Sequence, residues 1–272
     1  MRDFFRAACC TLALVSLAAP LSANDANKNG NEEYRLLELG GRKVRWALPA
    51  DGLPPTLRYS FLTQAQQFPG ARNCDSMLPP EAALEPSHIA AADFRREVRA
   101  AFSTWEAAAH IKFVETTSVR DADILIGADA KARGRAFTNV ALRDPPTGEQ
   151  PAGIGSIRQS LICLNPRRPW KIGFDGNLDV YDVRFTVTHE IGHAIGLDHP
   201  SPAGQLMSFR YAEQGRGLQP GDVAGAVALY GAHGSAATSP RQAGTTTPSP
   251  AAGRAGGRTF GLGDPALPAE GR

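Results

Sequence analysis

The sequence of 272 residues predicts an α/β domain with a partly parallel β-sheet, and two observations carry that prediction. The first is a long amphipathic helix over Ser87–Ala109, whose apolar stripe recurs at helical spacing through Phe94, Val98, Phe102 and Trp105. The second is that segments of strand character lie on both sides of this helix. A helix between strands is typical of a crossover connection, which joins parallel strands of one sheet.

The remaining elements follow from composition. Six segments have strand character because branched or aromatic residues dominate or alternate in them: Lys43–Leu48, Thr56–Leu62, Ile111–Thr116, Asp123–Ala128, Arg133–Val140 and Ser156–Asn165. Pro, Gly and polar residues predict long loops over Gln64–Pro86 and Arg143–Gly155. Asp179 is predicted to cap a second helix, with Asp182 three residues on. Pro220 begins a third helix that ends at Gly231.

The two ends of the chain differ in composition from its middle. Arg2 and Arg6 precede an apolar run, Ala7–Ala19, that is too short for a membrane span of about 20 residues. We therefore expect residues 1–23 to be a signal peptide, with a short membrane anchor as the alternative. Residues 24–41 are expected to be irregular, 42–231 to form the domain, and 232–272 to be a disordered, low-complexity tail. The mature protein is expected to be secreted or periplasmic, with no membrane span.

The net charge indicates which partners the protein can bind, and the cysteine content indicates whether it forms disulfides. The net charge is +2, and it falls to about −1 without the signal and the tail, with no basic run. A nucleic-acid partner is therefore not expected. Signal cleavage leaves Cys74 and Cys163, which in an oxidising compartment suggest one disulfide. Two buried free thiols are the alternative, because a sequence gives no distance between them.

The stretch Val187–Pro200 reads VTHEIGHAIGLDHP and contains the pattern HExxHxxGxxH. His189 and His193 are four residues apart, so a helix presents both imidazoles on one face. Gly196 can take a positive φ and end the helix, which allows His199 to supply a third nitrogen. Three histidines leave the fourth position of a tetrahedral zinc ion open, as in catalytic rather than structural sites.

Glu190 directly follows the first of these histidines and is the candidate catalytic residue. A carboxylate there can reach a water on the metal, take its proton and pass that proton to the leaving amine. A chance occurrence of the pattern is the competing interpretation, but the pattern fixes five positions, one of them a glycine with a geometric reason. A closed structural site is disfavoured because no fourth soft ligand lies nearby.

These residues resemble the metzincin metallopeptidases, in which the zinc pattern is followed by a Met-turn. Met207, with Tyr211 four residues on, resembles the turn of the matrixins. The segment Phe94–Ala128 resembles their first helix and the strands that follow it, and Leu218–Gly231 resembles their last helix. The resemblance, to a secreted form of bacterial type, implies a twisted, mostly parallel five-stranded sheet with an antiparallel edge strand. It also implies three helices, with the zinc helix at the floor of a cleft and Met207 packed beneath the metal.

The sequence departs from the family pattern in several places. Phe209 stands where astacin- and serralysin-like relatives have a tyrosine ligand, so no such ligand is expected. No histidine lies between His110 and His189, so the second, structural zinc of vertebrate matrixins is not expected. Calcium binding is left open. Asp175, Asn177 and Asp179 place oxygen-bearing side chains at alternate positions, as a calcium loop can, but a loop before a helix explains them equally well.

The expected function is that of a monomeric, zinc-dependent endopeptidase acting on a peptide or protein substrate. An extended peptide would pair with the edge strand near Ala136–Val140, and the loop Ser208–Gly217, including Phe209 and Arg210, would wall a pocket beyond the scissile bond. A zinc hydrolase of a non-protein amide and a non-catalytic peptide-binding module are the alternatives.

The sequence does not contain the matrixin latency sequence Pro-Arg-Cys-Gly. Cys74 could instead bind the zinc as a thiolate and block it, although a Cys74–Cys163 disulfide is favoured.

Overall fold

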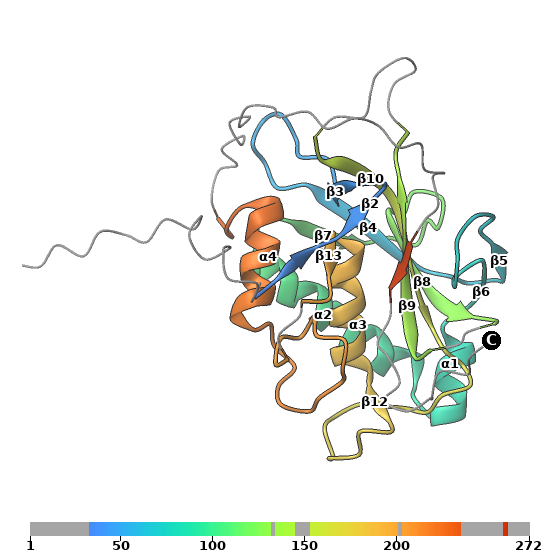
Figure 1. Cartoon of the computed structure of the whole chain (residues 1–272). Coiled ribbons are helices and arrows are strands. Elements are labelled where there is room, and N and C mark those ends of the chain that lie inside the picture. The colour runs from blue at the N-terminus through green and yellow to red at the C-terminus, as the bar shows by residue number, and fades with distance from the viewer. Residues whose placement is uncertain (1–32, 132–133, 145–152, 201–202, 235–257, 261–272) are drawn as a thin grey trace, which may run out of the picture. The chain divides into compact units, whose positions relative to one another are not determined.

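The computed structural model describes residues 33–131, 134–144, 153–200, 203–234 and 258–260. The expected signal peptide lies outside these residues. Five strands form the centre of the sheet, in the order β9 (Ala136–Leu142), β10 (Gly155–Leu164), β8 (Ile124–Asp129), β4 (Thr56–Phe61) and β7 (Lys112–Glu115). β10, β8, β4 and β7 run parallel to one another, and β9 runs antiparallel to β10. The predicted sheet and its antiparallel strand are confirmed (Figure 1).

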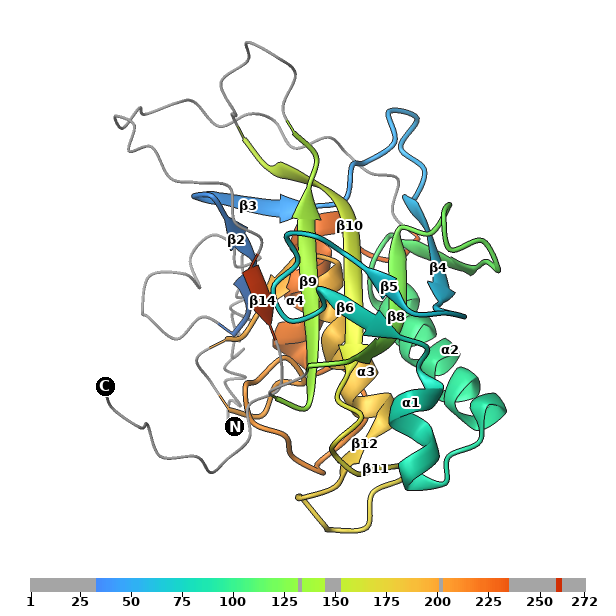
Figure 2. The ribbon, with the colours of Figure 1, turned by 90° about the vertical axis from the view of Figure 1, so that its right-hand side faces the viewer.

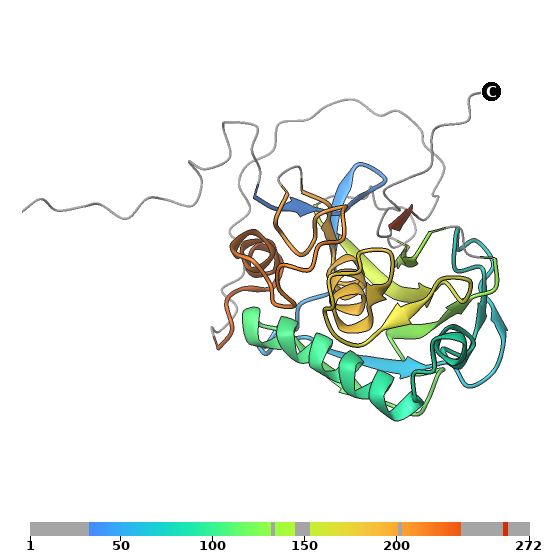
Figure 3. The same ribbon diagram turned by 90° about the horizontal axis from the view of Figure 1, so that it is seen from below.

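Helix α2 (Ala91–Ala108) is the crossover between β4 and β7. Its predicted apolar stripe is buried, and the ring of Phe102 stacks on Tyr59 of β4 with ring centroids 3.9 Å apart. Trp105, near the end of α2, donates from its indole nitrogen to the Thr188 carbonyl at 2.8 Å. This bond fastens α2 to helix α3 (Val183–Ala194), and Figure 3 shows the two helices next to each other.

Helix α3 is buried over nearly its whole length, which explains why its apolar residues are not confined to one face. It begins one turn later than predicted: Asp182, not Asp179, is the N-cap, and its carboxylate accepts from the Phe185 amide at 2.9 Å. Asp179 belongs to the preceding loop. The extra residues form strand β12 (Tyr181–Asp182), which pairs with β11 (Trp170–Lys171) and leaves no room for an earlier helical turn.

Side chains from three other parts of the chain hold the carboxyl end of α3. The Ala194 carbonyl accepts from the Trp46 indole at 2.9 Å and from the Ser160 hydroxyl at 3.1 Å. The Ile195 carbonyl accepts from the Tyr230 hydroxyl at 2.6 Å. The last carbonyls of a helix have no partner within it, so these bonds satisfy them while fixing the helix against the sheet and against α4 (Pro220–Tyr230).

Several short elements were not predicted. Within residues 33–41, expected to be irregular, β1 (Arg35–Leu36) pairs with β13 (Leu197–Asp198), and β2 (Glu38–Leu39) pairs with β3 (Arg42–Arg45). The loop Gln64–Pro86 contains β5 (Gln66–Gln67), β6 (Ser76–Leu78) and a helical turn, α1 (Glu81–Leu84), followed by a 3₁₀ turn, Glu85–Ser87. Two-residue strands carry too little periodicity to be recognised in a sequence.

The loop before α1 is joined to the sheet by a disulfide between Cys74 and Cys163 of β10. Both cysteines are fully buried, in a small apolar cluster with Leu62, Met77 and Leu161. No helix among the described residues is long and apolar enough to cross a membrane.

The tail also differs from its prediction at three residues. β14 (Arg258–Phe260) pairs antiparallel with the outer edge of β9, so this part of the tail is a strand rather than disordered chain. Figure 2 shows β9 lying between β14 and β10.

Candidate active site

Three histidine nitrogens converge beside the carboxyl half of α3. The Nε2 atoms of His189 and His193 are 3.1 Å apart, those of His189 and His199 are 3.1 Å apart, and those of His193 and His199 are 3.2 Å apart. His189 and His193 come from successive turns of the helix, while His199 follows β13. Within the described parts of the chain, these three form the one group of potential metal ligands close enough to share an ion.

The second ring nitrogen of each helical histidine has a backbone partner. His189 Nδ1 lies 2.8 Å from the Leu206 carbonyl, and His193 Nδ1 lies 2.8 Å from the Leu197 carbonyl. A carbonyl only accepts, so each Nδ1 carries the proton and each Nε2 presents its lone pair. Burial, and secondarily the charge of His199, lowers the pKa of His189 to about 3; burial also lowers the pKa of His193 and of His199. All three rings are therefore neutral near pH 7.

This donor set fits zinc. Nitrogens bound at 2.0–2.1 Å in a tetrahedral site lie about 3.3–3.4 Å from one another, close to the separations of 3.1–3.2 Å between the three Nε2 atoms. Neutral imidazole is a preferred ligand of zinc, and backbone acceptors on the outer nitrogens are typical of metal-binding histidines.

Glu190 is fully buried, and its side chain meets a residue that the sequence did not single out. Thr138 Oγ1 lies 2.7 Å from Glu190 Oε2 and 2.9 Å from the Glu190 carbonyl oxygen. Thr138 lies in the middle of β9, where inward- and outward-facing side chains alternate, and is itself fully buried. The hydroxyl therefore fixes the carboxylate relative to β9 as well as to the helix.

Close packing beneath the histidines depends on Gly192. A Cβ atom on Gly192 would lie 2.2 Å from Met207 Sδ and 2.9 Å from a ring carbon of Trp105. Met207 is buried, with 2% of its surface exposed, directly against this turn of α3. Its backbone is held by Asp222 of α4, whose carboxylate accepts from the amides of Met207 at 3.0 Å and Leu206 at 2.8 Å.

Gly196 makes the turn that returns the chain to His199. Its φ is +108°, and a Cβ atom there would lie 2.3 Å from the Val44 carbonyl oxygen. The Gly196 carbonyl accepts from the amide of Leu37, which lies between β1 and β2, at 2.8 Å. This bond holds the turn against the amino-terminal strands. Both the backbone conformation and the close approach require glycine at this position.

The matrixin family profile matches residues 82–231, more than half of the chain, and this span contains the histidines, Glu190 and Met207. The chain belongs to the matrixin family. It is 27% identical over 205 residues to metalloendoproteinase 4-MMP of Arabidopsis thaliana (69% of this chain, 56% of the relative). It is 26% identical over 153 residues to karilysin of Tannerella forsythia (53% and 30%), and 30% identical over 178 residues to stromelysin-3 of Mus musculus (60% and 33%). The chain thus spans between about a third and just over half of these relatives' lengths.

The Met-turn of this matrixin carries two aromatic residues with different surroundings. Phe209 is 53% exposed, and its ring makes an edge contact with His199, with centroids 5.2 Å apart. Tyr211 is buried: its hydroxyl accepts from the Asp182 amide at 3.0 Å and donates to Glu213 at 2.8 Å. Tyr211 therefore ties the loop after the Met-turn to the start of α3.

A lysine lies among the oxygens for which calcium was left open. Lys171 Nζ contacts the Asp175 carboxylate, the Asn177 carbonyl at 2.8 Å and Glu213 Oε1 at 2.5 Å. The side-chain oxygens of Asp175 and Asn177 also accept from backbone amides two residues on, as a loop before a helix requires. Burial alone would lower the pKa of Lys171, but its hydrogen bonds to Asp175 and Glu213 raise it overall. The ammonium group thus supplies a cation to this loop.

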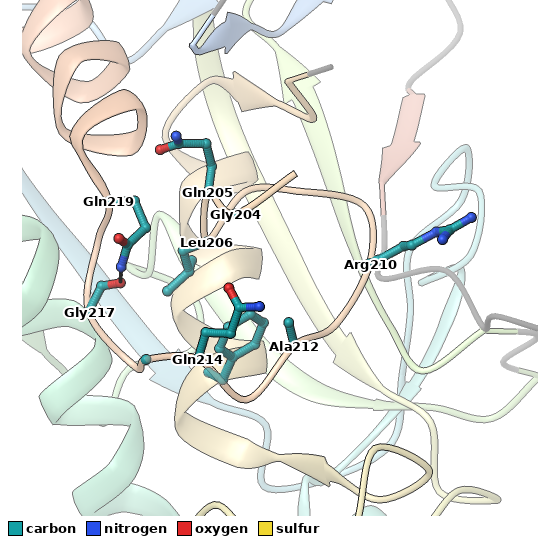
Figure 4. Close-up of a pocket in the computed structure, with 10 residues that line it drawn as sticks. Gly204, Gln205, Leu206, Arg210, Ala212, Gln214, Gly217 and Gln219 are labelled. Atoms are coloured by element: carbon teal, nitrogen blue, oxygen red, sulfur yellow. Dashed lines mark hydrogen bonds between the residues drawn. The ribbon is translucent and has the colours of Figure 1, made fainter. Parts of the chain in front are cut away.

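A pocket of about 70 Å³ lies between α3 and the loop after the Met-turn (Figure 4). Phe185 forms part of its wall, one turn before His189 on the same face of α3, and Leu206 lies between the pocket and His189. Of the two residues expected to line it, Arg210 reaches its rim with the side chain directed away, and Phe209 contacts His199 instead. The other lining residues are Gly204, Gln205, Ala212, Gln214, Gly215, Gly217 and Gln219.

Proposed function

We propose that this matrixin is a secreted zinc endopeptidase in which Glu190 acts first as general base and then as general acid in peptide-bond hydrolysis. The observation that carries the proposal is the convergence of three Nε2 atoms at a helix whose Glu190, the residue after His189, is fully buried and held by Thr138. His189, His193 and His199 would hold the metal. Zinc, when bound, supplies a Lewis acid that polarises a carbonyl and lowers the pKa of a water toward about 7.

Each residue of the site has a separate task in this proposal. Glu190 takes a proton from the attacking water at its carboxylate and delivers it to the leaving nitrogen. Thr138 keeps that carboxylate in one orientation, so little reorganisation is needed when the proton moves. Met207 and Gly192 support the helix from below without touching the substrate.

The sheet edge and the pocket indicate how a substrate would lie. An extended peptide would pair with β9, main chain to main chain, which brings its carbonyl groups past Glu190. The side chain after the scissile bond would enter the pocket of about 70 Å³ between Phe185 and Leu206. Its lining combines the apolar side chains of Phe185 and Leu206 with the amides of Gln205, Gln214 and Gln219.

The test combines metal analysis with cleavage of a peptide library. The parent protein should hold about one zinc per chain and lose activity with a chelator. Glu190→Ala should keep the zinc and lose about 10³-fold or more in kcat/KM, within the range for general acid–base catalysis. His193→Ala is the matched control and should lose both zinc and activity. Equal cleavage by Glu190→Ala and the parent would refute the mechanism, and zinc binding without peptide cleavage would refute the peptidase assignment.

Secretion is a separate part of the proposal. Its support is the basic start and the short apolar run of residues 1–23 together with the disulfide between Cys74 and Cys163, which is typical of an oxidising compartment. Amino-terminal sequencing of the exported protein should find a new terminus near Asn24. An exported protein that still begins at Met1 would exclude signal cleavage.

A further inference from the structure

A segment of the tail occupies the outer edge of the strand nearest the active site. Arg258–Phe260 forms β14, antiparallel to β9, with Arg258 opposite Val140, Thr259 opposite Asn139 and Phe260 opposite Thr138 (Figure 2). The other edge of β9 is paired with β10 over its whole length. β14 therefore takes the one edge of β9 that β10 leaves available.

The register brings this segment next to the candidate catalytic residue. Phe260 pairs with Thr138, whose hydroxyl lies 2.7 Å from Glu190 Oε2. Neighbouring strands of a sheet are about 4.8 Å apart, so the tail backbone runs within one strand spacing of Thr138. No other described strand reaches this edge so close to Glu190.

The backbone groups along one edge of a strand can serve a single partner at a time. A peptide substrate that pairs with β9 would need the same amides and carbonyls that β14 uses. We propose that the tail segment Arg258–Phe260 binds the substrate edge of β9 as a substrate-like strand and competes with peptide substrates for it. This inference rests on the proposed function, since the edge counts as a substrate site only if the protein cleaves peptides.

The tether makes the competition strong despite the short contact. Twenty-three residues, 235–257, separate the described end of the domain at Gly234 from β14. Two partners joined by a chain of about this length meet at an effective concentration on the order of 1 mM. A three-residue strand that binds with a dissociation constant of that order, or about tenfold tighter, would raise the apparent KM roughly twofold to tenfold.

Protection of the sheet edge against aggregation is the main alternative explanation. Proteins often cover exposed edges, and a short strand can do so without any role in activity. The two explanations differ in their kinetics. Competition raises KM and leaves kcat unchanged, whereas simple protection changes aggregation and thermal stability and leaves KM unchanged once the protein is monomeric.

The first experiment compares the full mature chain with a chain ending at Gly234. With a quenched fluorescent peptide, the shortened protein should show a KM roughly twofold to tenfold lower and the same kcat. Equal KM values would overturn the inference while leaving the peptidase proposal intact. If both proteins were inactive, the peptidase proposal would fail, and backbone hydrogen exchange would still decide occupancy: the β9 amides should exchange faster in the shortened chain. Equal exchange would exclude the tail from this edge.

Proline substitutions supply a matched pair. Thr259→Pro removes a backbone N–H and fixes φ at about −65° within β14, whereas Ala255→Pro makes the same change outside the paired residues. In the full chain, Thr259→Pro should lower KM as the truncation does, and Ala255→Pro should not.

An added peptide covering residues 254–264 should inhibit the shortened protein competitively, and the same peptide with Thr259→Pro should not. Equal effects of the two prolines would contradict specific pairing.

Discussion

The hydroxyl of Thr138 lies 2.7 Å from Oε2 of Glu190, joining β9 to the candidate base. We expect Thr138→Val to keep the shape of the site but to lose this bond. A hydrogen bond to a charged group is worth about 1.5–3 kcal/mol, so kcat should fall roughly 10-fold to 100-fold. KM and zinc content should stay near those of the parent, because Thr138 positions Glu190 and holds neither metal nor substrate side chain.

Thr138→Ser is the control for this prediction. Serine keeps the hydroxyl and loses only a methyl group, so it should recover most of the activity. If Thr138→Val hydrolysed peptides at the rate of the parent, or if Thr138→Ser were as weak as Thr138→Val, the positioning role would be excluded.

Gly192 lies where Met207 packs against the zinc helix, and this contact leaves no room for a side chain. Gly192→Ala would bring a Cβ atom to 2.2 Å from Met207 Sδ. Overpacking a rigid core costs about 1–3 kcal/mol or more, which for a domain of this size lowers Tm by roughly 3–10 °C. Gly217→Ala is the matched control, because nothing lies within 4 Å of a Cβ atom there and its φ is not positive. Equal Tm values for the two variants, measured by calorimetry, would contradict this packing.

The histidines, Glu190 and the partly parallel sheet followed from local patterns, because spacing along one helix and crossover connections are properties of contiguous segments. The order of the strands did not follow from them and comes from the structure. Thr138 did not, since it is 52 residues from Glu190 and an unremarked threonine in a strand carries no signal of its partner. The sequence predicted Asp179 as the N-cap of α3, whereas the N-cap is Asp182, three residues later. Both aspartates can cap a helix, and only the pairing of β11 with β12 distinguishes them. The strand at Arg258–Phe260 lies in a composition typical of disorder and depends wholly on the edge that it meets.

The disulfide between Cys74 and Cys163 closes a long loop, with 89 residues of sequence separation. Restricting the unfolded chain over such a loop stabilises the folded state by about 4–5 kcal/mol in the chain-entropy account. The double variant Cys74→Ala with Cys163→Ala should therefore lower Tm by roughly 8–20 °C. The zinc content of the folded fraction should not change, because neither sulfur lies in the histidine site. Unchanged thermal unfolding, or free thiols in the purified parent under non-reducing mass spectrometry, would refute the bridge.

Glu213 provides a pH-dependent link between the pocket loop and the loop that precedes α3. Burial raises the pKa of Glu213, but hydrogen bonds from Lys171, Tyr211 and the Gly176 amide outweigh it, and the pKa is lowered overall. A carboxyl group whose pKa is lower in the folded state binds fewer protons there than in the unfolded state. Its contribution to stability is therefore complete above the ordinary value near 4.5 and disappears as the pH falls through the lower, folded value.

We therefore expect Glu213→Gln to lower Tm by an amount that is constant from about pH 5 to pH 7 and shrinks below about pH 4.5. Added calcium should not restore the lost stability, because Lys171 already supplies the cation between Asp175 and Glu213. Calorimetry of parent and variant from pH 3 to pH 7, with and without calcium, measures both effects. A Tm difference that persisted unchanged at pH 3 would show that the Glu213 charge is not what holds the loop, and stabilisation of the parent by calcium would show that the lysine leaves room for the ion.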